Sequence, residues 1–138
     1  MVDYVKLGFV CVQNAGRSQM SVAFAKRERK ERGLEDKVEV LTGGTHPADE
    51  VHPEVVEAMQ EVGIDISTQE PQEVSTGELN ECDVVATMGC STLELDADVE
   101  VRDWALDDPH GQDMETVRAI RDEIEQRVTD LFDEYVSE

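Results

Sequence analysis

Short apolar runs alternate along the chain with longer stretches of helical spacing. The run from Val5 to Val12 contains β-branched residues and ends in a polar segment, which is typical of a buried strand. A second strand is predicted from Val38 to Leu41, closed by Gly43-Gly44. Asp83 to Met88 predicts a third strand, and Val99 to Ala105 a fourth.

Between these runs the spacing becomes helical. A helix is predicted over Ser18 to Arg32, with Gly33 as its stop, and another begins at His52-Pro53 because proline suits the first helical turn. Ser75-Thr76-Gly77-Glu78 has the spacing of a capping box and predicts a short helix. The last helix is predicted from Met114 to Tyr135, where apolar residues recur at three- and four-residue intervals: Val117, Ile120, Ile124, Val128 and Leu131.

Alternating strands and helices indicate an α/β fold, in which a four-stranded parallel sheet is covered by helices on both faces. The length fits a single domain over residues 1–138. In such sheets ligands bind beyond the carboxyl ends of the strands. Cys11 ends the first strand and Cys90 follows the third, so both are expected at one crevice. Cys82 precedes the third strand and is expected at the opposite edge.

Charge narrows the choice of partners. The chain has 33 acidic and 12 basic residues, a formal net charge of -21, which disfavours nucleic acid and anionic membranes as partners. The regular apolar pattern argues against disorder, so the charge indicates a very salty cytoplasm, where ~1 M salt shortens the Debye length to ~3 Å. The sequence has neither a run of ~20 apolar residues nor the features of a signal peptide, and we expect a cytoplasmic protein.

The three cysteines do not form a disulfide framework, and neither a CxxC pair nor zinc-ligand spacing is present, so we expect no metal site. An extended segment from Cys82 to Cys90 would separate them by ~26 Å at ~3.3 Å per residue. A disulfide requires Cα atoms within ~7 Å. Cys82 is therefore expected to be a buried residue at the strand edge.

The polar segment after the first strand has the features of an anion-binding loop. Backbone N–H groups and the start of a helix favour a thiolate at Cys11, and Arg17 can hold two oxygens of a tetrahedral oxyanion. We expect Ser18 to donate to the thiolate and to cap the helix, Asn14 to hold the loop through side-chain to backbone bonds, and Gly16 to permit an unusual backbone angle. The alternative is a cysteine of the core followed by a solvated arginine. The whole candidate loop is Cys11-Val12-Gln13-Asn14-Ala15-Gly16-Arg17-Ser18.

A transfer reaction also needs a general acid. The segment from Trp104 to Pro109 offers Asp107 and Asp108, adjacent carboxylates that disfavour each other's ionisation. A simple Asp-Pro turn is the alternative reading of this segment, but the cysteine loop favours catalysis.

Taken in order, these segments resemble the low-molecular-weight protein-tyrosine phosphatase superfamily, most closely its thioredoxin-coupled arsenate reductase branch, in an acidic, haloarchaeal-like version. The resemblance implies Cys11 as the nucleophile, Arg17 as the oxyanion binder and Asp108 as the general acid, with Ser18 supporting them. It implies no resident cofactor, and a thioredoxin-like protein or a small thiol as reductant. The segments that carry it are CVQNAGRSQM, GGTHP, HPEVVEAMQEVGIDIS, DVVATMGC and DWALDDPHGQD.

Two activities compete within this resemblance. As a reductase, the protein would take arsenate, with phosphate or sulfate as related oxyanions, and Cys90 or an external thiol would resolve the Cys11 adduct. The branch usually has a third cysteine, which is missing here because the stretch from Ser91 to Val101 has none. As a phosphatase, the protein would hydrolyse a phosphotyrosine of a phosphoprotein or an aryl phosphate through a cysteinyl-phosphate.

The residues after the Asp-Pro pair favour the reductase. Phosphotyrosine enzymes of this family usually carry aromatic residues there, whereas His110-Gly111-Gln112 follows in this chain and suits a small inorganic oxyanion. A third reading is a non-catalytic anion- or phosphoprotein-binding module. The complete set of Cys11, Arg17, Ser18 and Asp108 argues against that reading.

Overall fold

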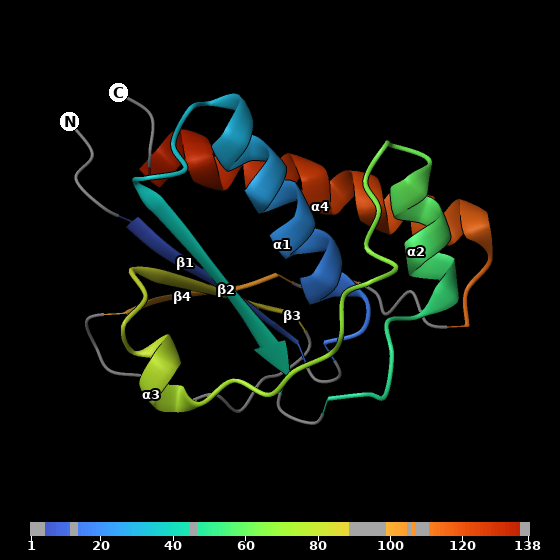
Figure 1. The fold of residues 1–138 in the computed structure, drawn as a ribbon, viewed down its shortest axis with the longest axis horizontal. Coiled ribbons are helices and arrows are strands. Elements are labelled where there is room, and N and C mark those ends of the chain that lie inside the picture. Colours follow the sequence, from blue (N-terminus) through green and yellow to red (C-terminus); the bar gives the residue numbers. More distant parts are fainter. Residues whose placement is uncertain are drawn as a thin grey trace.

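Four parallel strands form one sheet in the order β2-β1-β3-β4 (Figure 1). The computed structural model describes residues 5–11, 14–44, 47–88, 99–104, 106 and 111–135. β1 lies inside the sheet, with Leu7 opposite Val40 of β2 and opposite Val84 of β3. The strands are β1 (Val5–Cys11), β2 (Val38–Gly44), β3 (Val84–Met88) and β4 (Glu100–Asp103).

Side chains of β1 alternate between two apolar clusters, as the period of two in a strand requires. Leu7, Phe9 and Cys11 belong to the larger cluster, whereas Val10 belongs to a smaller one with Leu79. Helices α1, α2 and α4 lie on one side of the sheet, and the short α3 lies on the other (Figure 1). This arrangement confirms the predicted α/β fold class. The helices are α1 (Arg17–Glu31), α2 (Pro53–Gln60), α3 (Thr76–Leu79) and α4 (Met114–Tyr135).

Local signals predicted the helix ends well. Gly33 follows α1 with φ 68°, the left-handed conformation that ends many helices and suits glycine. Ser75 and Glu78 form the predicted capping box: the Glu78 backbone N donates to Ser75 Oγ over 3.1 Å, and the Ser75 backbone N donates to Glu78 Oε1 over 3.2 Å. None of the helices in the described part of the chain is long and apolar enough to cross a membrane.

β2 is longer than predicted. The strand continues through Gly43 to Gly44, whereas the sequence predicted that these glycines would close it at Leu41. Gly44 bridges to Glu73 in parallel, so the segment after α2 runs beside the end of β2. A Cβ on Gly43 would lie 2.4 Å from Val74 Cβ, so glycine permits this close approach. The two glycines thus lie inside the strand, where the packing of Val74 requires a glycine at position 43.

Candidate active site

Cys11 occupies the carboxyl end of β1, with Gly44 and Met88 as its neighbours across the sheet. Its side chain is buried and points to the helix-covered face, where α1 begins six residues later at Arg17. The first N–H groups of a helix have no partner inside the helix and favour negative charge. The strand and the helix thus place the sulfur where an anion is stabilised, as the sequence predicted for such a loop.

Two donors converge on the Cys11 sulfur. The Asn14 backbone N donates to Cys11 Sγ over 3.1 Å, and Ser18 Oγ lies 2.8 Å from the same sulfur. Asn14 Nδ2 donates to Ser18 Oγ over 2.7 Å, and Cys11 Sγ is the one acceptor among the described residues that the Ser18 hydroxyl contacts. With Asn14 Nδ2 as donor to its oxygen, the Ser18 hydroxyl has its own hydrogen available for the sulfur. The Cys11 sulfur thus has an N–H and an O–H group within hydrogen-bonding distance.

Asn14 holds the loop in shape. It is fully buried and has φ 51°, a left-handed conformation that asparagine tolerates better than most residues. Its Oδ1 accepts from Gln19 Nε2 and from the Gln72 backbone N, each over 3.0 Å, and its Nδ2 also donates to Thr42 Oγ1 over 2.9 Å. The predicted supporting role of Asn14 agrees with this geometry, although most of the partners are side chains.

One of the two backbone details predicted for the loop agrees with the structure, and the other was wrong. Gly16 has φ -141° and ψ -92°, a combination outside the helical and extended regions, which agrees with the predicted unusual backbone angle; the left-handed residue of the loop is Asn14. Ser18 does not cap the helix, because α1 begins at Arg17 with Gly16 as its N-cap and without a side-chain cap. The Ser18 hydroxyl faces Cys11 and Asn14, and these contacts compete with capping.

Arg17 connects the loop with the chain that follows β4. Its Nη1 donates to the backbone oxygen of Leu106 over 2.9 Å. Leu106 belongs to the segment from Trp104 to Pro109, and this bond holds its backbone oxygen at the guanidinium. Asp108 and Cys90 lie outside the described residues, as do Val12 and Gln13 of the loop.

Cys82 lies away from this site. It comes just before β3, at the opposite end of the sheet from Cys11, and packs with Leu79 and Val85 on the face of α3. Burial raises the pKa of the Cys82 thiol to about 11, although nearby Lys6 opposes the shift. A thiol with so high a pKa is protonated and unreactive near neutral pH. The predicted buried, strand-edge Cys82 is confirmed.

Sequence reasoning missed three residues of the loop's support. Gln19 Nε2 donates to the Asn14 backbone oxygen, Thr42 Oγ1 donates to the Phe9 backbone oxygen, and Gln72 Nε2 donates to the Thr42 backbone oxygen. Gln19 gives a signal in the sequence, since it is a polar residue one position after Ser18 on the inward side of a predicted helix. Thr42 and Gln72 give none, because only the tertiary fold brings them to the loop.

The donor set of the loop favours an anion over a cation. The Asn14 backbone N–H and the Ser18 hydroxyl surround the Cys11 sulfur, and Arg17 adds a guanidinium, a group that binds oxyanions. Within the described ranges, no three His, Cys, Asp or Glu side chains gather as a metal site requires. The arrangement can therefore hold a tetrahedral oxyanion against the Cys11 sulfur.

Relatives among known proteins match nearly the whole length of this chain. A Halobacterium salinarum protein named "Putative arsenate reductase" is 75% identical over 131 residues, which cover 94% of this chain and 92% of that protein. A "Glutaredoxin arsenate reductase" of Synechocystis is 35% identical over 131 residues, covering 92% of this chain and 95% of the relative. A solved structure described as "An arsenate reductase in the phosphate binding state" aligns with a TM-score of 0.78 and 31% identity, covering 95% of this chain and 98% of the other.

The source of the first relative fits the adaptation to salt that the charge predicted. The family model that matches is described as "Low molecular weight phosphotyrosine protein phosphatase" and covers residues 6–138. The predicted resemblance is confirmed: the chain belongs to the low molecular weight phosphotyrosine protein phosphatase family.

Proposed function

We propose that this protein is an arsenate reductase in which Cys11 is the nucleophile. The observation that carries the proposal is the pair of donors on the Cys11 sulfur, Ser18 Oγ at 2.8 Å and the Asn14 backbone N at 3.1 Å. Both stabilise the thiolate, which is the reactive form of cysteine. The 75% identical relative carries the name of an arsenate reductase and supports arsenate as the oxyanion.

In the first step the Cys11 thiolate attacks arsenic. A sulfur–arsenic bond forms and one arsenate oxygen leaves as water, for which Asp108 is the proposed proton donor. Arg17 balances the charge on the remaining oxygens through its planar guanidinium. Arsenic remains in its pentavalent state at this stage.

In the second step a second thiol attacks the Cys11 sulfur. The sulfur–arsenic bond breaks, its electron pair stays on arsenic, and arsenite is released as a disulfide forms. We assign this thiol to Cys90, and a thioredoxin- or glutaredoxin-like dithiol, or a small thiol, then reduces the Cys11–Cys90 disulfide. The Synechocystis relative, whose name includes glutaredoxin, supports an external thiol of this kind.

Hydrolysis of phosphate esters is the second candidate, because the matching family is one of phosphotyrosine phosphatases. It uses the same Cys11, Arg17 and Asp108, but water rather than a thiol resolves the intermediate. Cys90 therefore separates the two activities.

The test is a side-by-side assay in molar salt of the parent and the Cys11→Ser, Cys90→Ser and Cys82→Ser variants. Arsenate reduction is measured with thioredoxin, glutaredoxin or a small thiol, and hydrolysis with an aryl phosphate. Cys11→Ser should abolish both activities, and Cys82→Ser should change neither. Cys90→Ser should strongly reduce arsenate turnover and leave aryl phosphate hydrolysis unchanged.

Mass spectrometry after a single turnover with arsenate should find a Cys11–Cys90 disulfide. A parent enzyme that hydrolyses the aryl phosphate but forms no arsenite with any thiol would overturn the reductase proposal in favour of the phosphatase. A parent that does neither would leave only an anion-binding module.

A further inference from the structure

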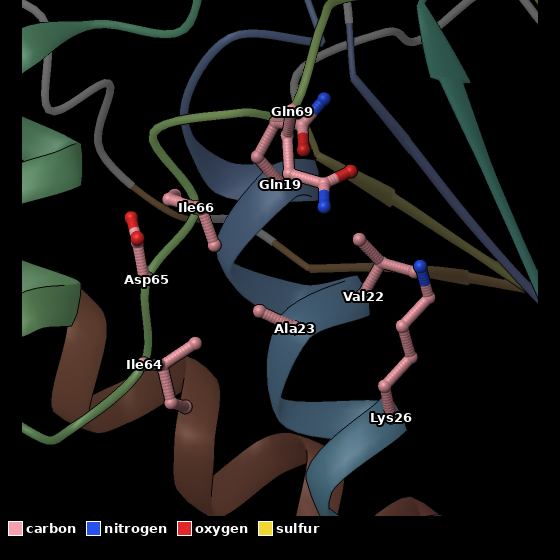
Figure 2. Close-up of a pocket in the computed structure, with 8 residues that line it drawn as sticks. All are labelled: Gln19, Val22, Ala23, Lys26, Ile64, Asp65, Ile66 and Gln69. Carbon is pink, nitrogen blue, oxygen red and sulfur yellow. The ribbon is translucent and has the colours of Figure 1, made fainter.

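Two adjoining pockets lie along α1, next to the Cys11 loop but outside it. Their cavity volumes are about 150 and 170 Å³. Four residues line both: Gln19, Val22, Lys26 and Gln69. The first pocket also has an apolar wall of Ala23, Ile64 and Ile66, and Asp65 at its side (Figure 2).

Gln19, which lines both pockets, carries an unpaired buried acceptor. The residue is only 2% exposed, and its Nε2 donates to the Asn14 backbone oxygen and to Asn14 Oδ1, each over 3.0 Å. A flipped amide would place Oε1 against these two oxygens, so the contacts fix which atom faces Asn14. Gln19 Oε1 is left buried without a hydrogen-bond partner among the described residues. An unpaired buried acceptor is costly, so a donor is expected at this position.

Lys26 is the cation that α1 brings to the same pockets. It follows Gln19 by seven residues, which is two helical turns or ~10.5 Å of rise, and both side chains lie on one face of the helix. Side chains in a helix lean toward its N-terminus, so the Lys26 chain extends toward Gln19. Figure 2 shows it bending over Val22 in that direction, while Asp65 points away on the other side of the pocket.

Neither of the two neighbouring carboxylates, Asp65 and Glu70, forms an ion pair with the Lys26 ammonium. The Asp65 carboxylate accepts from the Ser67 backbone N over 2.9 Å, and Glu70 is exposed and turns its backbone oxygen to Gln19. None of the ion pairs found among the described residues includes Lys26. Its ammonium is thus free to donate to an acceptor in the pocket.

We propose that the Lys26 ammonium donates to Gln19 Oε1 across this pocket and thereby positions the Cys11 loop. A charged donor on Oε1 polarises the amide and strengthens the bonds from Nε2 to Asn14. Asn14 in turn directs the Ser18 hydrogen to the Cys11 sulfur. Lys26 is therefore a positioning residue that acts through Gln19. The proposal rests on Cys11 being the nucleophile and not on which oxyanion it attacks.

The test compares Lys26→Met, which keeps the aliphatic chain and removes the charge, with the matched control Lys30→Met. Lys30 is also exposed on α1 and lines neither pocket. The readouts are the pH profile of Cys11 alkylation by iodoacetate and the kcat and KM for an aryl phosphate, in sodium, potassium or ammonium chloride at one ionic strength. Lys26→Met should slow alkylation at mildly acidic pH by about two- to tenfold, the effect of one hydrogen bond.

Lys30→Met should behave as the parent does, and ammonium should restore Lys26→Met because it supplies the missing donor. In the Gln19→Met background, Lys26→Met should have no further effect, since its route to the loop is gone. Equal alkylation profiles for Lys26→Met, Lys30→Met and the parent would overturn the proposal. If Cys11 alkylation in the parent depended on potassium or ammonium as strongly as it does in Lys26→Met, a solvent cation rather than Lys26 would fill the pocket, and the proposal would be overturned. A parent enzyme that does not reduce arsenate would refute only the proposed function, because the alkylation of Cys11 requires no arsenate.

Discussion

Replacing Asn14 tests most directly how the loop around Cys11, the proposed nucleophile, is held in shape. The Asn14 side chain makes four hydrogen bonds: to Ser18 Oγ, to Thr42 Oγ1, from Gln19 Nε2 and from the Gln72 backbone N. Asn14→Gly removes all four but keeps the freedom to adopt φ 51°. At about 0.5–1.5 kcal/mol each, the free energy of unfolding should fall by roughly 2–6 kcal/mol. Asn14→Ala should lose about 1–2 kcal/mol more, because alanine also resists the left-handed conformation.

The assay is urea unfolding in constant molar potassium chloride, followed by the fluorescence of Trp104, the single tryptophan, which is buried. The slope with urea should stay unchanged, because the surface exposed on unfolding stays similar. An Asn14→Gly variant with the midpoint of the parent would refute the argument that these bonds hold the loop.

Asn14→Asp separates stability from chemistry. The carboxylate keeps an acceptor for Gln19 and Gln72 but turns the donor that faced Ser18 into a second acceptor. The Ser18 hydrogen should then turn to the carboxylate and away from Cys11, so iodoacetate should alkylate Cys11 more slowly than in the parent. Alkylation as fast as in the parent would show that Ser18 does not need Asn14 to direct its hydrogen.

Three further predictions concern packing, pH and salt. Gly43→Ala should lower the free energy of unfolding by about 1–3 kcal/mol, because the new Cβ would lie 2.9 Å from the Val74 backbone N. Gly77→Ala is the control and should not lower it, because its Cβ would lie 3.8 Å from the nearest neighbour. Equal urea midpoints for the two variants would contradict this prediction. The pKa of Cys82 is raised to about 11, whereas an unfolded thiol loses its proton from about pH 8.5. The free energy of unfolding should therefore fall across that pH window by roughly 3 kcal/mol more in the parent than in Cys82→Ala, and unfolding curves of the two measured in parallel would show it; an equal fall in both would contradict the buried thiol. The thermal midpoint should rise steeply from dilute to molar potassium chloride, because salt screens the net charge of -21; a constant midpoint would refute adaptation to salt.

Features set by neighbours in the sequence were predictable. The last helix has the predicted bounds, Met114 to Tyr135, because its apolar residues follow a regular helical period. The capping box of Ser75 and Glu78 was also predictable, since both partners lie within one turn. Cys11 could be placed at a strand end because a buried apolar run stops there.

Features set by distant contacts were not predictable. In the sequence, Gly43 resembles a residue that ends a strand. In the fold it lies inside β2, and the close approach of Val74 explains why the strand has a glycine there. The left-handed Asn14 depends on Thr42 and Gln72, which are 28 and 58 residues away in the sequence. Serine is a residue type that often caps helices, but the Ser18 hydroxyl contacts the Cys11 sulfur instead. No rule based on neighbouring residues in the sequence includes that competition.

The position of Cys11 on β1 has a consequence for motion. β1 pairs along its length with β2 and from Leu7 onward with β3, so its backbone amides should exchange with solvent only when the sheet opens. Cys11, the proposed nucleophile, is therefore anchored in what we expect to be the slowest-exchanging part of the molecule. Any group that forms a bond with its sulfur, whether an oxyanion or another thiol, has to travel to it.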